Sequence, residues 1–356
     1  MSDRGRFATS TTEGGGALAA DDLRAPVRRI STITPMRDEI ASVEHFVADL
    51  ATQDFAGELQ VLVADGGSVD GSVERLKAAA EGASLPLEVL GNSAGWVSPG
   101  LNACIGRATG DLIVRLDCHS RYPPHYLRRC AELAEQTGAW NVGGRVEPKG
   151  ETPMERAVAC AMDSPFGGIG WTRLGGTEPV EIDTVTFGAF RPVVFSAAGL
   201  FDEEMVRNQD DELNLRIRKA GGRIVLDPTL AVRYRPRGSL AKVWRQYYEY
   251  GFWKVRVMLK HRAIVTLRSM APLVFLLMIA LLAVAVPFSA IALLLLFAVL
   301  VLYLVFALVF ALRSVRAEGE PLSLTPRVMS VFPAFHFGYG VGMARGWLAA
   351  AGDRRR

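Results

Sequence analysis

The chain has 356 residues, with 40 Lys and Arg against 37 Asp and Glu, and its net charge of +3 is too small to indicate a nucleic-acid partner. Its mean hydropathy of +0.20 is high for a purely soluble protein. The apolar residues are concentrated, because 1–262 has an ordinary soluble composition whereas 269–312 is almost free of charge. We therefore expect a soluble part followed by a membrane part.

The amino-terminal residues 1–27 are predicted to form a disordered tail. They are rich in Gly, Ser, Thr and Ala and contain no apolar run, which also excludes a secretory signal. Four cysteines show neither a CxxC pair nor the spacing of zinc ligands, so we expect reduced thiols that fill the core of a cytosolic domain. They are Cys104, Cys118, Cys130 and Cys160.

Strand and helix patterns alternate in the soluble part. The sequence predicts strands at 29–34, 59–64, 87–90 and 111–116, and helices at 39–52, 69–80 and 101–108. Pro35 is expected to end the first strand, and the run 59–64 is apolar enough for a buried parallel strand. This alternation predicts an α/β domain with a mostly parallel, Rossmann-like sheet and right-handed crossovers.

Three of the predicted strands end in polar clusters. These clusters are Pro35-Met-Arg-Asp-Glu39, Asp65-Gly-Gly-Ser68 and Asp117-Cys-His119. Ligands of open α/β sheets bind beyond the carboxyl ends of the strands, so the clusters together predict one active site. Ordinary turn chemistry explains each cluster singly but explains all three poorly.

The residues in these clusters have distinct chemical uses. Glycines after Asp65 let a ligand approach the backbone, and the Asp65 carboxylate can accept hydrogen bonds from a base or ribose. Asp117 and His119 can face one divalent ion that neutralises a nucleoside-diphosphate leaving group. An imidazole suits Mn²⁺ better than Mg²⁺, and the alternative is that His119 is a hydrogen-bonding partner rather than a ligand.

A third acidic region, Asn208-Gln-Asp-Asp-Glu212, precedes a helix predicted at 213–220. The helix dipole favours acidic residues at this end, which would account for one or two of them. Three consecutive carboxylates also repel one another, and this would raise at least one pKa and suit a general base.

The carboxyl-terminal third is predicted to associate with a membrane. Residues 269–287 and 288–312 form two apolar runs that fit a transmembrane hairpin. Arginines flank both outer ends, so the positive-inside rule places both ends in the cytoplasm. Before the hairpin, 233–268 mixes basic and aromatic residues as an interfacial helix would, although some of them could instead bind a diphosphate or lipid phosphate. A weaker segment, 328–351, leaves spanning, re-entry and interfacial placement open.

Taken together, the ordered motifs resemble the inverting family-two glycosyltransferases with a GT-A fold, and within them the succinoglycan-type exopolysaccharide glucosyltransferases. The resemblance covers roughly residues 28–350. It implies a GT-A catalytic domain at 28–232, the basic and aromatic region at 233–268, the hairpin at 269–312, and a third membrane-associated segment with a basic tail at 313–356. The family's usual Asp-x-Asp is Asp117-Cys-His119 here.

The resemblance also implies roles for individual residues. Asp210 matches the family's general base, and Asp211 is the second choice. The nucleotide would be bound by Pro35, Arg37, Glu39, Asp65, Gly66 and Asp117, with the metal on Asp117 and His119 and the acceptor or diphosphate on Gly188, Arg191, Gln246 and Tyr250. Because Glu249-Tyr250 replaces the Arg-Trp of the processive synthases, processivity is not carried over.

The implied activity is transfer of a hexose from a nucleoside-diphosphate sugar to a polyprenyl-linked acceptor, with Mg²⁺ or Mn²⁺ as cofactor. UDP-glucose is the favoured donor, with GDP-mannose and UDP-galactose as alternatives. The implied location is the inner membrane, multi-pass, with the catalytic domain in the cytoplasm. Competing hypotheses are an inactive glycosyltransferase-like binding module, a polyprenyl-phosphate glycosyl transferase, a transporter subunit and a nucleotidyltransferase. The uncharged run 269–312 speaks against transport. A nucleotidyltransferase would need a Gly-rich loop with a catalytic Lys or Arg near the first strand, for which Arg37 is a poor substitute.

Overall fold

The computed structural model describes residues 20–168, 176–263 and 267–353. They form two compact units. The first takes the residues up to Glu147 and 176–234, and the second takes 148–168 and the described residues from Arg235 onward. Residues 148–168 thus belong to the second unit, although the sequence included them in the catalytic domain 28–232.

Within the described residues, the nine strands of the first unit form one sheet in the order β3-β2-β1-β4-β8-β6-β9-β5, with β7 paired to β9. The first four, β1 to β4, pair with one another in parallel, as predicted. Pairs β4–β8, β6–β8, β5–β9 and β7–β9 are antiparallel. The strands are β1 (Arg29–Met36), β2 (Glu58–Asp65), β3 (Leu87–Gly91), β4 (Leu112–Arg115), β5 (Ser120–Arg121), β6 (Asn141–Pro148), β7 (Val180–Glu181), β8 (Ala189–Phe190) and β9 (Ile224–Tyr234).

The prediction that Pro35 ends the first strand was wrong. β1 continues to Met36, and Pro35 pairs with Ala64 of β2. On the other side of β1 the register with β4 stops at Ile33. Because pairing with β4 has ended there, the missing N–H of Pro35 interrupts no hydrogen bond of that ladder.

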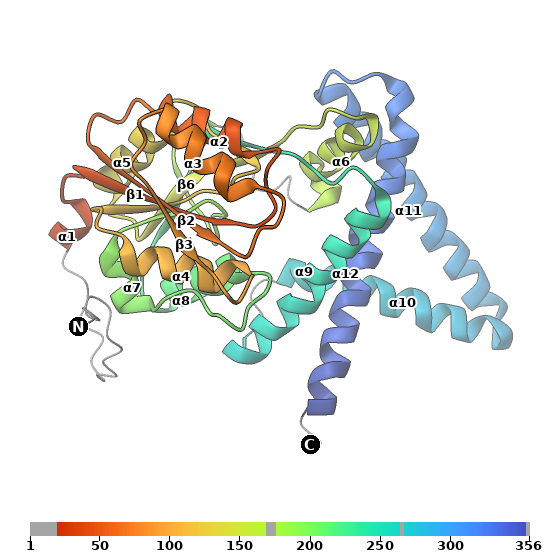
Figure 1. Ribbon diagram of the computed structural model, residues 1–356. Coiled ribbons are helices and arrows are strands. Elements are labelled where there is room, and N and C mark those ends of the chain that lie inside the picture. Colours follow the sequence, from red (N-terminus) through yellow and green to blue (C-terminus); the bar gives the residue numbers. More distant parts are fainter. Residues whose placement is uncertain (1–19, 169–175, 264–266, 354–356) are drawn as a thin grey trace. The chain divides into compact units, whose positions relative to one another are not determined.

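Helices cover both faces of the sheet (Figure 1). Val61 and Val63 of β2 join one apolar cluster with α2, α3 and α5, whereas Leu62 and Ala64 join a second cluster with α4, α7 and α8. This alternation follows from the two-residue period of a strand. The helices are α2 (Val43–Ala51), α3 (Ser72–Gly82), α4 (Val97–Arg107), α5 (Tyr126–Thr137), α7 (Pro192–Ala198) and α8 (Gln209–Lys219). All four cysteines are buried and free, as expected.

Residues 20–27 are ordered, although the sequence placed them in a disordered tail. Ala20–Arg24 forms the short helix α1. Leu23 is buried, and Arg24 Nη1 donates to the carbonyl of Gln136 at 2.6 Å. A docked segment of this kind needs buried side chains, which the tail composition did not indicate.

The second unit is helical. It contains α6 (Pro153–Asp163), η1 (Pro165–Gly167), α9 (Leu240–His261), η3 (Leu267–Met270), α10 (Ala271–Ala285), η4 (Val286–Phe288), α11 (Ala290–Ala317), η5 (Leu322–Leu324) and α12 (Thr325–Asp353). Two stretches, Leu267–Phe288 and Ala290–Ala317, are long and apolar enough to span a membrane. Only 6% and 11% of their most apolar windows are buried, unlike the core helix of a soluble protein.

The weak third segment is one helix, α12, which runs through Pro333. It packs along α9, so one side of the predicted interfacial helix faces protein. Gly338, Gly342 and Gly346 line this contact, where an added Cβ would lie 2.0 Å from the Tyr248 carbonyl at Gly342 and 3.0 Å from the Phe252 carbonyl at Gly346. Glycine at four-residue spacing lets the two backbones approach closely.

Candidate active site

The loops that follow β1 and β2 are joined by hydrogen bonds. The amide of Asp38 donates to Ser68 Oγ at 2.9 Å, and Val69 N donates back to Asp38 Oδ1 at 2.9 Å. Asp38 adopts a left-handed backbone with φ of 52° to make this exchange. Gly66 N also donates to the carbonyl of Met36 at 2.8 Å. Two of the predicted clusters therefore form one continuous surface at the carboxyl end of the sheet.

Asp65 stabilises its own loop. Its carboxylate accepts hydrogen bonds from Gly67 N at 3.1 Å, from Ser68 N at 3.2 Å and from Ser68 Oγ at 2.6 Å. Gly67 has φ of +82°, a conformation that glycine adopts without strain. A carboxylate has about four lone-pair sites, so these bonds leave capacity for a ligand.

Arg37 reaches across to a third loop, where its Nη1 donates to the Gly95 carbonyl at 3.4 Å. Its side chain is 59% exposed, so the guanidinium remains accessible to an anion. Gly66 lies beside the same loop, because an added Cβ would be 3.3 Å from the Gly95 carbonyl. The residues predicted to bind nucleotide from Pro35 to Gly66 are thus brought together.

The turn after β4 presents Asp117 and His119 on one side. Ser120 N closes it on the Asp117 carbonyl at 3.1 Å, while Cys118 between them is buried. Tyr122 is buried, and its Oη accepts a hydrogen bond from Asp117 N at 2.7 Å. Cys118 and Tyr122 thus anchor the turn in the core. The side chains of Asp117 and His119 lie on its other side, toward the loops after β1 and β2.

His119 is held by a carboxylate from the first loop. Its Nδ1 lies 2.9 Å from Glu39 Oε1. If a neutral imidazole donates from Nδ1, its lone pair lies on Nε2, which is the arrangement of many metal-bound histidines. Glu39 therefore contacts His119, which the sequence had not paired with it.

Sequence reasoning missed Arg115, the last residue of β4. Its side chain is only 5% exposed, and it contacts two carboxylates. Nη2 lies 3.3 Å from Asp117 Oδ1, and Nη1 forms an ion pair with Asp210 Oδ1. A buried charge requires partners, so an arginine inside the apolar run Leu112-Ile-Val-Arg-Leu116 was the available signal.

Asp210 lies in the first turn of α8 with its side chain 19% exposed. Burial raises the pKa of Asp210 to about 6; Arg115 opposes this rise, and the charges of Asp117 and Asp211 add to it. The sequence attributed a raised pKa to repulsion within the acidic run, but burial is the larger cause. Glu212 is also buried and is paired with Arg216 at 2.7 Å.

The segment before α8 is fixed by hydrogen bonds from side chains of α8 itself and of α4. Arg216 Nη2 donates to the Leu200 carbonyl at 2.6 Å, and Ser98 of α4 donates to the Met205 carbonyl at 3.0 Å. Asn102 Nδ2 donates to the Phe201 carbonyl at 2.8 Å. These contacts hold the start of α8, and with it Asp210, against the sheet.

Gly188 and Arg191, predicted as an acceptor or diphosphate pair, lie at opposite ends of β4. The Gly188 carbonyl accepts from Arg115 N at 2.9 Å, which places it beside the site. Arg191 is 3% exposed and donates to the carbonyls of Leu23 at 3.2 Å and Asp111 at 3.3 Å. Because β8 runs antiparallel to β4, Arg191 reaches the amino end of β4, away from Gly188, and its predicted contact with the acceptor or diphosphate stays a prediction.

Gln246 and Tyr250 belong to α9 of the second unit. Gln246 Nε2 donates to Tyr250 Oη at 2.9 Å, an i, i+4 pair on one face of that helix. Their predicted contact with the acceptor or diphosphate stays a prediction.

In the described part of the chain, no group of three or more His, Cys, Asp and Glu is placed to hold a metal ion. Asp117 and His119 offer one carboxylate and one imidazole from a single turn, with Glu39 oriented on the imidazole. This donor pair fits an ion whose remaining ligands come from a bound diphosphate, and imidazole favours Mn²⁺ over Mg²⁺.

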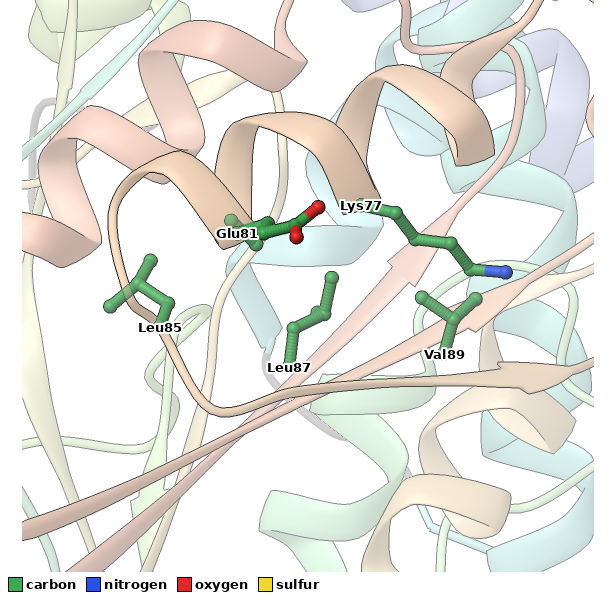
Figure 2. A pocket seen from close by; sticks show the side chains of 6 residues that line it. Lys77, Glu81, Leu85, Leu87 and Val89 are labelled. Atoms are coloured by element: carbon green, nitrogen blue, oxygen red, sulfur yellow. The ribbon is translucent and has the colours of Figure 1, made fainter.

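A shallow hollow lies at the edge of the sheet (Figure 2). Figure 2 shows Lys77 and Glu81 of α3 on one side and Leu87 and Val89 of β3 on the other. Its lining shares no residue with the loops after β1, β2 and β4, so we place no substrate there.

Comparison with known proteins gives a consistent result. Residues 31–190 match the glycosyl transferase family 2. The succinoglycan biosynthesis protein ExoA of Rhizobium meliloti (strain 1021) is 31% identical over 258 residues, which cover 72% of this chain and 77% of that protein. An undecaprenyl-phosphate 4-deoxy-4-formamido-L-arabinose transferase of Klebsiella pneumoniae (strain 342) is 29% identical over 141 residues, covering 38% and 42% of the two chains.

Among solved structures, the mannosyltransferase PcManGT from Pyrobaculum calidifontis, in complex with GDP-Man and Mn²⁺, is similar over 88% of both chains, with 20% identity and a TM-score of 0.57. With the family match, this likeness confirms the predicted GT-A fold class.

Proposed function

Since the chain belongs to glycosyl transferase family 2, we propose that it moves a hexose from a nucleoside-diphosphate sugar to a lipid-linked acceptor, with inversion at the anomeric carbon. The observation that carries the proposal is the bridge made by Arg115. One buried guanidinium contacts both Asp117, on the donor side, and Asp210, the candidate base. A pKa of about 6 suits Asp210 to accept a proton near neutral pH.

The proposed reaction is one in-line displacement. Oδ1 of Asp210 is engaged by Arg115, so Oδ2 takes the proton from the acceptor hydroxyl. The acceptor oxygen forms the new bond to the anomeric carbon while the bond to the diphosphate oxygen breaks, and the nucleoside diphosphate leaves with the electron pair. Asp211 is the alternative base.

The donor would lie on the loops after β1 and β2. Arg37 would bind a phosphate through its accessible guanidinium, Asp65 would bind the base or ribose, and Gly66 would allow close approach. Asp117 and His119 would hold Mn²⁺ or Mg²⁺, which when bound supplies positive charge for the departing diphosphate. UDP-glucose is the favoured donor, with GDP-mannose and UDP-galactose as alternatives.

The acceptor is proposed to be polyprenyl-linked. Support comes from the two apolar stretches of the second unit and from the polyprenyl-phosphate substrate in the name of the Klebsiella relative. The flanking arginines favour a multi-pass protein of the inner membrane with its catalytic unit in the cytoplasm. A polyprenyl-diphosphate saccharide and a bare polyprenyl phosphate are the two acceptor candidates.

The test is a donor screen with the purified chain in lipid. Each of the three donors is supplied with either acceptor, with Mn²⁺, Mg²⁺ or chelator, and nucleoside-diphosphate release and lipid-linked sugar are both measured. Acceptor-dependent release with one donor supports the proposal. Nucleotide binding without release from any donor would instead identify a binding module.

A further inference from the structure

The second unit contains a loop whose place among the helices has no role in the chemistry above. α6 begins at the charged end of α11, where Arg156 pairs with Glu320 at 3.2 Å and Lys149 pairs with Glu318 at 3.2 Å. Further along α6, Ser314 Oγ donates to the Cys160 carbonyl. α6 therefore runs antiparallel to α11 and leads the chain away from the charged end (Figure 1).

Residues 164–168, the tip of the loop that follows α6, lie between α11 and α12. The Phe166 ring stacks on Phe310 with centroids 5.4 Å apart and lies 5.6 Å from Tyr303 and 4.7 Å from His336. Tyr303 precedes Arg313, at the end of the apolar run, by ten residues. At 1.5 Å per residue Tyr303 lies roughly 15 Å from Arg313 along the helix and Phe310 roughly 5 Å, so the Phe166 ring lies roughly 5–15 Å inside a ~30 Å hydrocarbon core.

The backbone N–H groups of Phe166 and Gly167 and the carbonyl of Phe166 are satisfied within the protein. Gly167 N donates to the Ser164 carbonyl at 2.8 Å, Phe166 N donates to Ser164 Oγ at 3.3 Å, and Pro165 has no N–H. The Phe166 carbonyl accepts from His336 Nε2 at 2.7 Å. Non-helical backbone at membrane depth is tolerated only when it is satisfied and buried in protein in this way.

The loop gives hydrogen-bonding roles to two polar side chains of apolar helices, Tyr303 of α11 and His336 of α12. Since the Phe166 carbonyl can only accept, His336 carries its proton on Nε2 and its Nδ1 accepts from Tyr303 Oη at 2.9 Å. Gly167 closes the turn, because an added Cβ would lie 1.8 Å from the Ala161 carbonyl. Asp163, half-buried just before the loop, requires a protein-lined entry.

We propose that residues 164–168 form a loop that enters the bilayer beside α11 and α12, with the exposed Pro165 in contact with lipid acyl chains. The inference rests on the proposed spanning of the membrane by α10 and α11. The partner of this surface is the hydrocarbon of the membrane.

The test measures membrane depth in the full chain reconstituted into nanodiscs. Single nitroxides are placed at Pro165→Cys, at Leu302→Cys as an exposed position of α11, and at Glu74→Cys as an exposed position of α3. Because the native cysteines are buried, wild type treated with the same nitroxide reagent should react little, and its signal gives the background. We expect oxygen to collide with the labels at 165 and 302 more often than a water-soluble nickel complex does, and the reverse at 74.

A second measurement uses unmodified protein, so it does not depend on the folding of the Pro165 variant. Phospholipids with a mid-chain diazirine are photolysed, and adducts are mapped by mass spectrometry. Adducts on the peptide containing Pro165 as well as on α11 support the loop. If the label on α11 lies in lipid while the label at 165 lies in water and no adducts form there, the insertion of the loop alone is overturned. If the labels at both positions lie in water, the membrane anchoring on which the loop rests is overturned.

Discussion

Arg115 and Asp210 form a buried ion pair between residues 95 positions apart in the chain. One lies at the end of a central strand and the other in the first turn of α8, so the pair joins the donor side of the sheet to the acceptor side. The same guanidinium contacts Asp117 at 3.3 Å. Three of the predictions below test residues joined by this bridge or placed around it.

Asp210→Asn should abolish proton abstraction while leaving the donor loops unchanged. General-base catalysis contributes about 10²–10⁴-fold, so we expect transfer to fall by that factor. The affinity for the nucleotide, measured by calorimetry, should stay within about twofold, since Asp210 is not among the donor-loop residues. Asp211→Asn is the matched control in the same helical turn. A larger loss in that variant than in Asp210→Asn would make Asp211 the base.

The pH dependence of transfer should follow the ionisation of Asp210. Its pKa is raised to about 6 by burial, and the base must be ionised, so the rate should fall as the pH drops through about 6. Arg115 lowers this pKa, and Arg115→Met should therefore move the acid limb of kcat/KM to higher pH, with Arg115→Lys moving it less.

Arg129→Met is the control for that shift, because Arg129 also pairs with a buried aspartate, Asp227 at 2.6 Å, away from the site. It should lower stability without moving the acid limb. An unchanged limb in Arg115→Met would mean that Asp210 is not the group that titrates.

Much of the site was predictable because it follows strands with clear apolar patterns. The runs at β1, β2 and β4 identify the parallel strands, and parallel strands bring their carboxyl ends to one edge. Asp65, Asp117 and Asp210 were found for this reason or by family resemblance. The side-chain pairing predicted from the residues, that of Asp117 with His119, is local in sequence, whereas Arg115 and Asp210 meet only through the packing of α8 on the sheet.

The antiparallel half of the sheet was not predictable from local pattern. β8 has two residues, and its direction decides which neighbours share an end of the sheet. Gly188 and Arg191 are three residues apart, about 10 Å along a strand, so one lies beside the site and the other at the amino end of β4. Likewise, nothing local in residues 148–168 says which unit they pack against, so the sequence included them in the catalytic domain.

Glu39→Gln should weaken the binding of Mn²⁺ by about 10–100-fold, because a carboxylate that orients a ligand histidine typically contributes that much. The free-ion signal in electron paramagnetic resonance measures this without any turnover. Glu44→Gln, which removes an exposed partner of Arg75 on α2, is the control. Equal Mn²⁺ affinity in both variants would show that His119 is a hydrogen-bonding residue and not a ligand.

Arg191→Met should destabilise the first unit rather than impair donor binding. Its guanidinium satisfies the carbonyl of Leu23 in a buried hydrogen bond and that of Asp111 in a part-buried one, and a buried carbonyl left unsatisfied costs about 1–3 kcal/mol. The thermal midpoint should fall while the KM for the donor is unchanged. Arg107→Met, which removes a surface pair with Glu88, should cost about 0–1 kcal/mol. A raised donor KM at unchanged stability would support the phosphate-binding role.

Gly342→Ala should separate α9 from α12. The added Cβ would lie 2.0 Å from the Tyr248 carbonyl, and backbone cannot move aside as a side chain can, so a loss of about 1–3 kcal/mol is expected. Gly352→Ala is the matched control in the same helix, since nothing lies within 4 Å of its added Cβ. Helix propensity predicts a gain of up to about 1 kcal/mol there. Thermal unfolding in nanodiscs, followed by the fluorescence of Trp244 and Trp253 on α9, measures both. If the two variants unfold at the same temperature, the close glycine contact does not hold the helices together.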